Sequence, residues 1–146
     1  MKNYSFILNF LQNIVAIILG LFIGATVNMS LVILGPAIIA PPPGVDMTTE
    51  AGLLASIHLF EPKHFLFPFL AHALGTLVGS FIAALIATNY KLSKAGFIAI
   101  MFLYGGCYMA YLLPAPIWFE VSDIALAYLP MGYLGYYFSN QLQRRK

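Results

Sequence analysis

Long runs of apolar residues fill most of this chain, and short polar or proline-rich segments separate them. A helix needs about 20 mostly apolar residues to cross about 30 Å of hydrocarbon. Four runs satisfy this length, so the pattern predicts an all-α integral membrane protein with four transmembrane helices. The predicted spans are residues 6–34, 64–88, 95–113 and 124–142.

A short helix is expected between the first two spans, over residues 49–60. Three consecutive prolines, Pro41 to Pro43, precede it and enforce an extended connector without backbone donors. Asp46 or Thr48 is suited to cap the helix. Neither of its sides carries the charge of a helix lying on a membrane surface. We therefore expect an interfacial or re-entrant helix packed between lipid and the other helices.

Prolines and capping residues set the expected ends of the spans. Gly35 and Pro36 predict the end of the first span, and Pro114 predicts the end of the third. Pro68 is expected to kink the second span. Ser122 is a plausible N-cap for the fourth. Under this interpretation, the loop before that span holds Trp118, Glu120 and Asp123.

The composition agrees with a membrane protein of one domain, residues 1–146. Hydrophobic residues make up 61% and charged residues 8% of the chain, and mean hydropathy is +0.87. Soluble domains have about 25% charged residues, so a soluble fold is excluded. The first apolar run is longer than the 7–15 residues of a signal-peptide core, so we expect a retained helix. The single Cys107 excludes an internal disulfide framework.

Charge is divided between the two predicted sides of the membrane. Four spans place both termini and the loop 89–94 on one side. That side holds six of the seven basic residues, and all five acidic residues lie on the other. Positive charge favours the cytoplasm, so we expect a multi-pass cell-membrane protein with cytoplasmic N- and C-termini. The basic residues form no nucleic-acid stripe. They are Lys2, Lys91, Lys94, Arg144, Arg145 and Lys146.

His58, Glu61 and His64 recur at three-residue intervals around a corner on the acidic side. Two imidazoles and a carboxylate form the ligand set of many catalytic zinc or iron sites. Pro62 interrupts any helix here, so the three side chains need not share a face. The favoured interpretation is interfacial, with Glu61 paired or solvated and the histidines anchoring the helix end. A transition-metal site is the alternative.

A second candidate site is a layer of polar side chains in the outer half of the membrane. His72 lies about 12 Å below His64 along the predicted helix, at 1.5 Å per residue. An ionisable residue at such a depth is a functional candidate. The layer either forms a pocket that opens outward or fixes helix packing through hydrogen bonds. Its members are Asn28, His72, Tyr104, Tyr108 and Tyr128.

Two Gly-x-x-x-Gly pairs predict close helix contacts. Gly20 and Gly24 lie in the first span, and Gly75 and Gly79 lie in the second. Helices approach closely at such pairs because no side chain intervenes. We expect these contacts within the chain or between copies.

Three functions remain open at this stage. The leading one is a non-enzymatic protein of the lipid bilayer that binds a ligand or partner through its extracytoplasmic face. It would act as a homo-oligomer or as a subunit of a larger membrane complex. The second is a metal-dependent membrane enzyme with its site at the histidine corner. The third is an oligomeric transporter or channel that uses the polar layer. The sequence contains no Gly-rich phosphate loop, H-E-x-x-H motif or nucleophile elbow.

Overall fold

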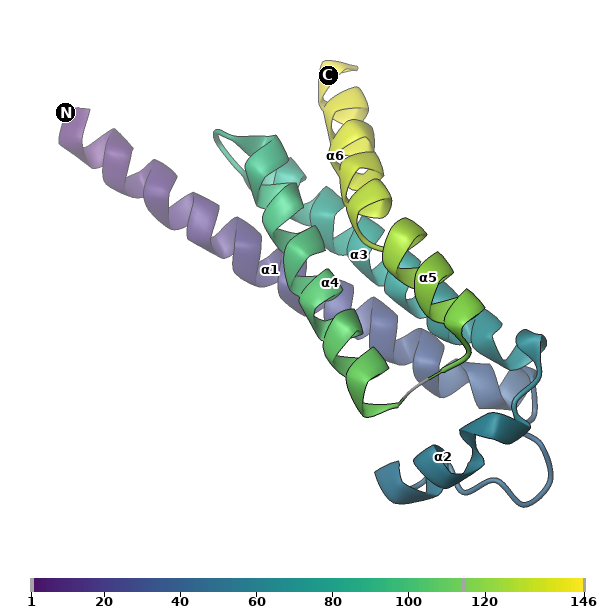
Figure 1. Cartoon of the computed structure of the whole chain (residues 1–146). Helices are drawn as coiled ribbons and strands as arrows, with labels where there is room; N and C mark the ends of the chain where they lie inside the picture. Colours follow the sequence, from purple (N-terminus) through teal and green to yellow (C-terminus); the bar gives the residue numbers. More distant parts are fainter. Residues whose placement is uncertain (1, 114, 146) are drawn as a thin grey trace.

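The computed structural model describes residues 2–113 and 115–145, with side chains from residue 4 onward. This part of the chain is helical and contains no strand, as Figure 1 shows. The longer helices are α1 (Lys2–Ile38), α3 (Leu66–Ile86), α4 (Lys91–Leu112), α5 (Ile117–Leu126) and α6 (Leu129–Arg144). The shorter elements are α2 (Glu50–Ser56) and the 3-10 helices η1 (Ile57–Leu59) and η2 (Pro62–Phe65).

Helix α3 is the centre of the bundle. It packs against α1, α4 and α6, and it also contacts α5. Its buried positions are almost all small residues, which allow several helices to approach one axis closely. These positions include Ala71, Ala73, Gly75, Thr76, Gly79, Ser80, Ala83 and Ala84.

Three described helices are long and apolar enough to cross a membrane. They are Tyr4–Ile38, Pro62–Ile86 and Lys91–Leu112. They correspond to the first three predicted spans, each with shifted ends. The region of the predicted fourth span is divided into α5 and α6, which follow one another along α3 (Figure 1).

Pro130 explains why the last region is not one continuous helix. It is in the first turn of α6, where its missing N–H would have no partner anyway. In an uninterrupted helix the carbonyl of Leu126 would accept a hydrogen bond from the N–H of residue 130. Proline has no N–H to donate, and its ring would clash with that carbonyl. The chain therefore ends α5 at Leu126 and begins α6 at Leu129.

The expected loop before this region is instead the helix α5. Trp118, Glu120 and Asp123 all lie within α5, because the helix starts directly after Pro116. Ser122 is not an N-cap, since its hydroxyl donates to the carbonyl of Trp118 one turn earlier. The prediction of a loop here was wrong because the apolar run was taken to begin too late.

The prediction that the first span ends at Gly35 and Pro36 also needs correction. Helix α1 continues through Pro36 to Ile38, since the N–H of Ile39 still donates to the carbonyl of Gly35 at 2.8 Å. Pro68 is the third residue of α3, so it occupies a first turn that tolerates proline. Pro114 lies outside the described residues.

The predicted short helix is formed by α2 and η1. Its N-cap is Thr49, whose hydroxyl accepts from the N–H of Gly52 at 3.0 Å. Asp46 stabilises the turn before the N-cap, because its carboxylate accepts hydrogen bonds from Thr48 and Thr49. These donors, the Thr48 hydroxyl foremost, hold the pKa of Asp46 below its ordinary value. The helix lies beside one end of the bundle (Figure 1).

Candidate ligand-binding site

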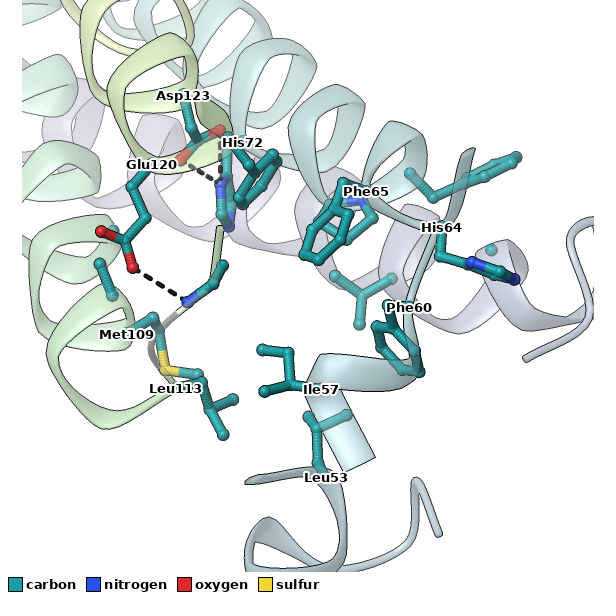
Figure 2. A pocket seen from close by; sticks show the side chains of 18 of the residues that line it. Leu53, Ile57, Phe60, His64, Phe65, His72, Met109, Leu113, Glu120 and Asp123 are labelled. Atoms are coloured by element: carbon teal, nitrogen blue, oxygen red, sulfur yellow. Dashed lines mark hydrogen bonds and ion pairs between the residues drawn. The ribbon is translucent and has the colours of Figure 1, made fainter. Parts of the chain in front are cut away.

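A cavity of about 260 Å³ lies at the end of the bundle where α3 begins. The C-terminal ends of α1 and α4 line it together with η1, η2, α3 and α5. Figure 2 shows side chains from these elements converging on it. Most lining residues are apolar, among them Leu53, Ile57, Phe60, Phe65, Met109 and Leu113.

An aromatic cluster closes one wall of this cavity. Phe65 is 5% exposed, and its ring centroid lies 4.8 Å from that of Phe119 and 5.7 Å from that of Trp118. Phe60 adds an edge contact at 6.1 Å. Packed aromatic pairs of this kind contribute about 0.5–1.5 kcal/mol beyond their burial. The cluster therefore attaches the corner before α3 to α5 and fixes the wall between them.

At the inner end of the cavity, three polar side chains form a connected group. The Nδ1 atom of His72 lies 2.8 Å and 3.0 Å from the two carboxylate oxygens of Asp123. The hydroxyl of Tyr128 donates to the same carboxylate at 2.7 Å. The rings of His72 and Tyr128 also lie 5.6 Å apart, at an angle of 30°. We call these three residues the His72 group.

The backbone leaves room for the Tyr128 hydroxyl. A Cβ atom added at Gly106 would lie 2.0 Å from that oxygen. Any side chain at Gly106 would therefore displace the tyrosine from Asp123. Tyr128 is fully buried and Asp123 is 5% exposed, so α3, α4, α5 and the α5–α6 break meet at one buried polar point.

The contact with Asp123 determines how His72 faces the cavity. A carboxylate only accepts hydrogen bonds, so Nδ1 of His72 carries the proton and donates it. Nε2 then has a free lone pair when the ring is neutral. Among the described residues Nε2 has no hydrogen-bond partner, and His72 lines the cavity. The site therefore offers one positioned imidazole nitrogen at the end of an apolar chamber.

Glu120 supplies a second carboxylate to the cavity lining. One of its oxygens accepts from the backbone N–H of Ala115 at 2.9 Å, which fixes the connector before α5 (Figure 2). The other oxygen has no hydrogen-bond partner among the described residues. It is thus available to a bound molecule.

Two of the three metal-ligand candidates, Glu61 and His64, use their polar groups in other contacts. Nδ1 of His64 accepts from the N–H of Glu61 at 2.9 Å, and its Nε2 lies 3.1 Å from the carbonyl of Ala40. Glu61 pairs with Lys63 at 3.0 Å, and this contact lowers the pKa of its carboxyl. His58 is exposed. Residues 2–113 and 115–145 contain no group of three His, Cys, Asp or Glu residues that could hold a metal ion.

The structure brings together only part of the predicted polar layer. His72 and Tyr128 meet through Asp123, which sequence analysis had assigned to a loop. Tyr104 is 71% exposed and Tyr108 is 55% exposed, so both face away from the bundle. Asn28 packs against Gly75 through its Cβ position and has no hydrogen bond among the described residues. A helix starting directly after Pro116 would have assigned Asp123 to a helix instead of a loop, but not to the buried contact with Tyr128.

The two glycine pairs face one another across α1 and α3. A Cβ atom at Gly20 would lie 2.8 Å from the carbonyl of Gly79, and one at Gly24 would lie 2.7 Å from that of Gly75. The reverse additions collide equally closely with α1. These contacts lie within the chain, and they set the position of α3 and therefore of His72.

The chain was compared with models of protein families, with curated proteins and with solved structures, and none of them matches it.

Proposed function

We propose that this protein crosses the membrane four times, with α5 and α6 together as the fourth span and both termini in the cytoplasm. In this orientation it binds an amphiphilic small molecule in the cavity from the extracytoplasmic side. The observation that carries the proposal is the His72 group at the inner end of a mainly apolar chamber. Ligand sites typically combine apolar walls with a few convergent polar groups.

The charge distribution supports the orientation. Lys91 and Lys94 lie at the opposite end of the bundle from the cavity, and Arg144 and Arg145 are on that side too. Glu61, Glu120 and Asp123 lie at the cavity end. The excess of Lys and Arg in cytoplasmic segments is the strongest general rule of membrane topology. Lys146 and the side chain of Lys2, which entered the sequence argument, lie outside the described part.

The size of the cavity limits the ligand. Sites for drug-sized molecules have volumes of about 300–1,000 Å³, and this one is slightly smaller. A single alkyl chain or a compact lipophilic molecule fits such a volume better than a whole two-chain lipid. The polar end of the ligand would meet Nε2 of His72, and its apolar part would contact the phenylalanine and aliphatic wall.

Filling the cavity tests this proposal. Ala110 lines the cavity, and Ile100 lies on the same helix with 57% exposure away from the cavity. We expect wild-type protein in a nonionic detergent to bind one molecule of 1-dodecanol, measured by native mass spectrometry. Ala110→Phe should weaken this binding by about tenfold or more, because the larger side chain fills part of the cavity. A tenfold loss of affinity corresponds to about 1.4 kcal/mol. Ile100→Phe should leave it unchanged, and equal binding by all three proteins would overturn the proposal.

Proton transfer is the second candidate function, and one observation favours it. Asp123 orients His72 in the way that a carboxylate orients a general base, with Nε2 directed to the cavity. His72→Gln separates the two roles, because glutamine can hydrogen-bond but does not titrate. Retained ligand binding with lost turnover or lost proton uptake would favour proton transfer.

A further inference from the structure

The charge of the cavity lining is the feature that limits the ligand further. The lining contains two acidic residues, Glu120 and Asp123, and two histidines. Among the residues that the structure describes, no lysine or arginine lines the cavity. A polar group that enters the cavity therefore meets carboxylates without a fixed cation to balance them.

The hydrogen bonds indicate which of these groups are charged. Asp123 accepts hydrogen bonds from both His72 and Tyr128 through its two oxygens, as a carboxylate does. His64 is neutral, since its Nδ1 accepts the N–H of Glu61. Two carboxylates give a lining charge of −2 when His72 is neutral and −1 when it is protonated. The sign is negative in either case.

The surroundings reinforce this sign. The only basic residue on the acidic side of the chain is Lys63, and it is already paired with Glu61. Asp46 adds a further negative charge next to Met47, a residue of the cavity lining. A surface of one sign raises the local concentration of ligands of the opposite sign. Anionic ligands therefore meet repulsion in the lining and beside it.

We propose that the ligand is a cationic amphiphile, an alkyl chain or compact apolar body that ends in an amine. This inference rests on the proposed function and specifies the headgroup of the same ligand. The ammonium donates to the unpaired oxygen of Glu120 and to Nε2 of His72. Its apolar part occupies the wall formed by residues such as Phe65 and Met109. An amine supplies both the positive charge and the N–H donors that these two acceptors require.

A series of ligands with the same chain tests the headgroup directly. Dodecylamine, 1-dodecanol and dodecanoate are added separately to wild-type protein in a nonionic detergent, and native mass spectrometry gives each Kd. We expect the amine to bind at least about tenfold more tightly than the alcohol, because an opposite charge in a partly buried site is weakly screened. The carboxylate should bind most weakly. Dodecanoate binding as tightly as the amine would overturn the inference while leaving the proposed function intact.

Two charge-neutralising variants identify the source of the preference. Glu120→Gln removes the lining carboxylate and retains an acceptor for the N–H of Ala115. Glu50→Gln removes an exposed carboxylate on the same side that does not line the cavity. We expect the advantage of the amine over the alcohol to fall about tenfold in Glu120→Gln and to persist in Glu50→Gln. An equal change in both variants, or no change in either, would overturn the assignment to this site.

Failure of the proposed function gives a different result. In that case none of the three ligands binds more tightly to wild-type protein than to Ala110→Phe. Circular dichroism and elution volume in detergent confirm that each variant is folded before binding is measured. His72→Gln provides a second test of the role of Glu120 in binding the amine. This variant leaves Glu120 intact and should retain part of the preference for the amine over the alcohol.

Discussion

Asp123 is a carboxylate inside a bundle of apolar helices, where an unpaired charge costs several kcal/mol. His72 and Tyr128 offset this cost by donating to both of its oxygens. Each partner comes from a different helical segment. The residue is therefore both the support of a candidate site and a junction between α3 and the break after α5.

Tyr128→Phe tests this junction. The substitution removes one donor to Asp123 and leaves the ring in place, so we expect a loss of about 1–3 kcal/mol in the free energy of unfolding. Thermal unfolding in detergent measures the loss. The control is Tyr104→Phe, because Tyr104 is 71% exposed and has no hydrogen bond among the described residues. Equal stability of both variants would contradict the role of Asp123.

His64 acts as a clamp between two backbone segments. It accepts from the N–H of Glu61 and donates to the carbonyl of Ala40, 24 residues earlier. The two ends of the segment 41–60, which carries α2 and η1, are thereby held together. This role requires a neutral imidazole, with Nδ1 free of its proton and Nε2 protonated.

We expect His64→Ala to make the segment 41–60 more mobile. The backbone amides of residues 41–60 should exchange with solvent faster, because local protection depends on such contacts. His58→Ala should leave exchange unchanged, since His58 is exposed. Hydrogen exchange with mass spectrometry measures both variants. Elemental analysis of the same samples tests the zinc or iron prediction, and metal that is present in wild type and lost in His64→Ala would replace the clamp by a metal site.

Sequence reasoning at this scale found His72 and Tyr128 but not the residue that joins them. Both were noticed because they are polar groups within apolar runs. Asp123 lies near the edge of its run, where an acid normally faces water, so only the tertiary structure reveals its burial. Tyr104 and Tyr108 satisfied the same depth criterion, yet they face outward, because depth along a helix does not specify rotation about its axis.

At the scale of elements, the contact between α1 and α3 is made by backbone against backbone. Gly20 and Gly24 meet Gly75 and Gly79 with almost no space for a methyl group. In a membrane, helices gain little from hydrophobic burial, so close packing of this kind provides much of their association.

Gly79→Ala should disturb this contact. Its new Cβ would lie 2.7 Å from the carbonyl of Gly20, and backbone atoms cannot move aside cheaply. We expect a loss of about 1–3 kcal/mol, typical of overpacking. Gly105→Ala is the matched control, because nothing lies within 4 Å of its added Cβ. Thermal unfolding in detergent compares the two variants, and similar midpoints would contradict the packing argument.

The positions of the prolines explain where element boundaries could be predicted. The long apolar runs predicted α1, α3 and α4 because their length alone requires helices in a membrane. The helix end predicted at Pro36 was wrong, since the effect of a proline depends on its distance from the helix end. Pro130 has the greater effect, because it divides the last region between two helices. This effect follows from the start of α5 at Ile117, which extends the last helical region to both sides of Pro130.

For the molecule as a whole, the predicted orientation in the membrane determines from which side a ligand reaches the cavity. A reporter enzyme that is active only outside the cytoplasm should be inactive when it is fused after Ser93. The same reporter should be active when it is fused after Glu120, on the side of the cavity. The physical reason is the retention of Lys and Arg on the cytoplasmic side. The reverse result would place the cavity in the cytoplasmic leaflet.

The oligomeric state stays a prediction. Both glycine pairs are used inside the chain, so an association between copies would have to use other surfaces. Gly96 and Gly105 of α4 have open space beside them, but a bilayer fills such space as readily as a second copy does. Cross-linking in native membranes measures this property independently of the cavity.

The divided last region also has a consequence for biosynthesis. Neither α5 nor α6 is by itself long enough to be a spanning helix, and α5 carries Asp123. An acid at the centre of a spanning helix opposes transfer from the translocon into lipid by about 2.5–3.5 kcal/mol, and Asp123, the seventh residue of α5, carries part of this cost. His72, the partner of that acid, leaves the ribosome about fifty residues earlier as part of α3. Under the proposed topology, the nascent chain therefore has to keep α3 beside the translocon until its last segment arrives, so that the two polar groups enter the bilayer already paired.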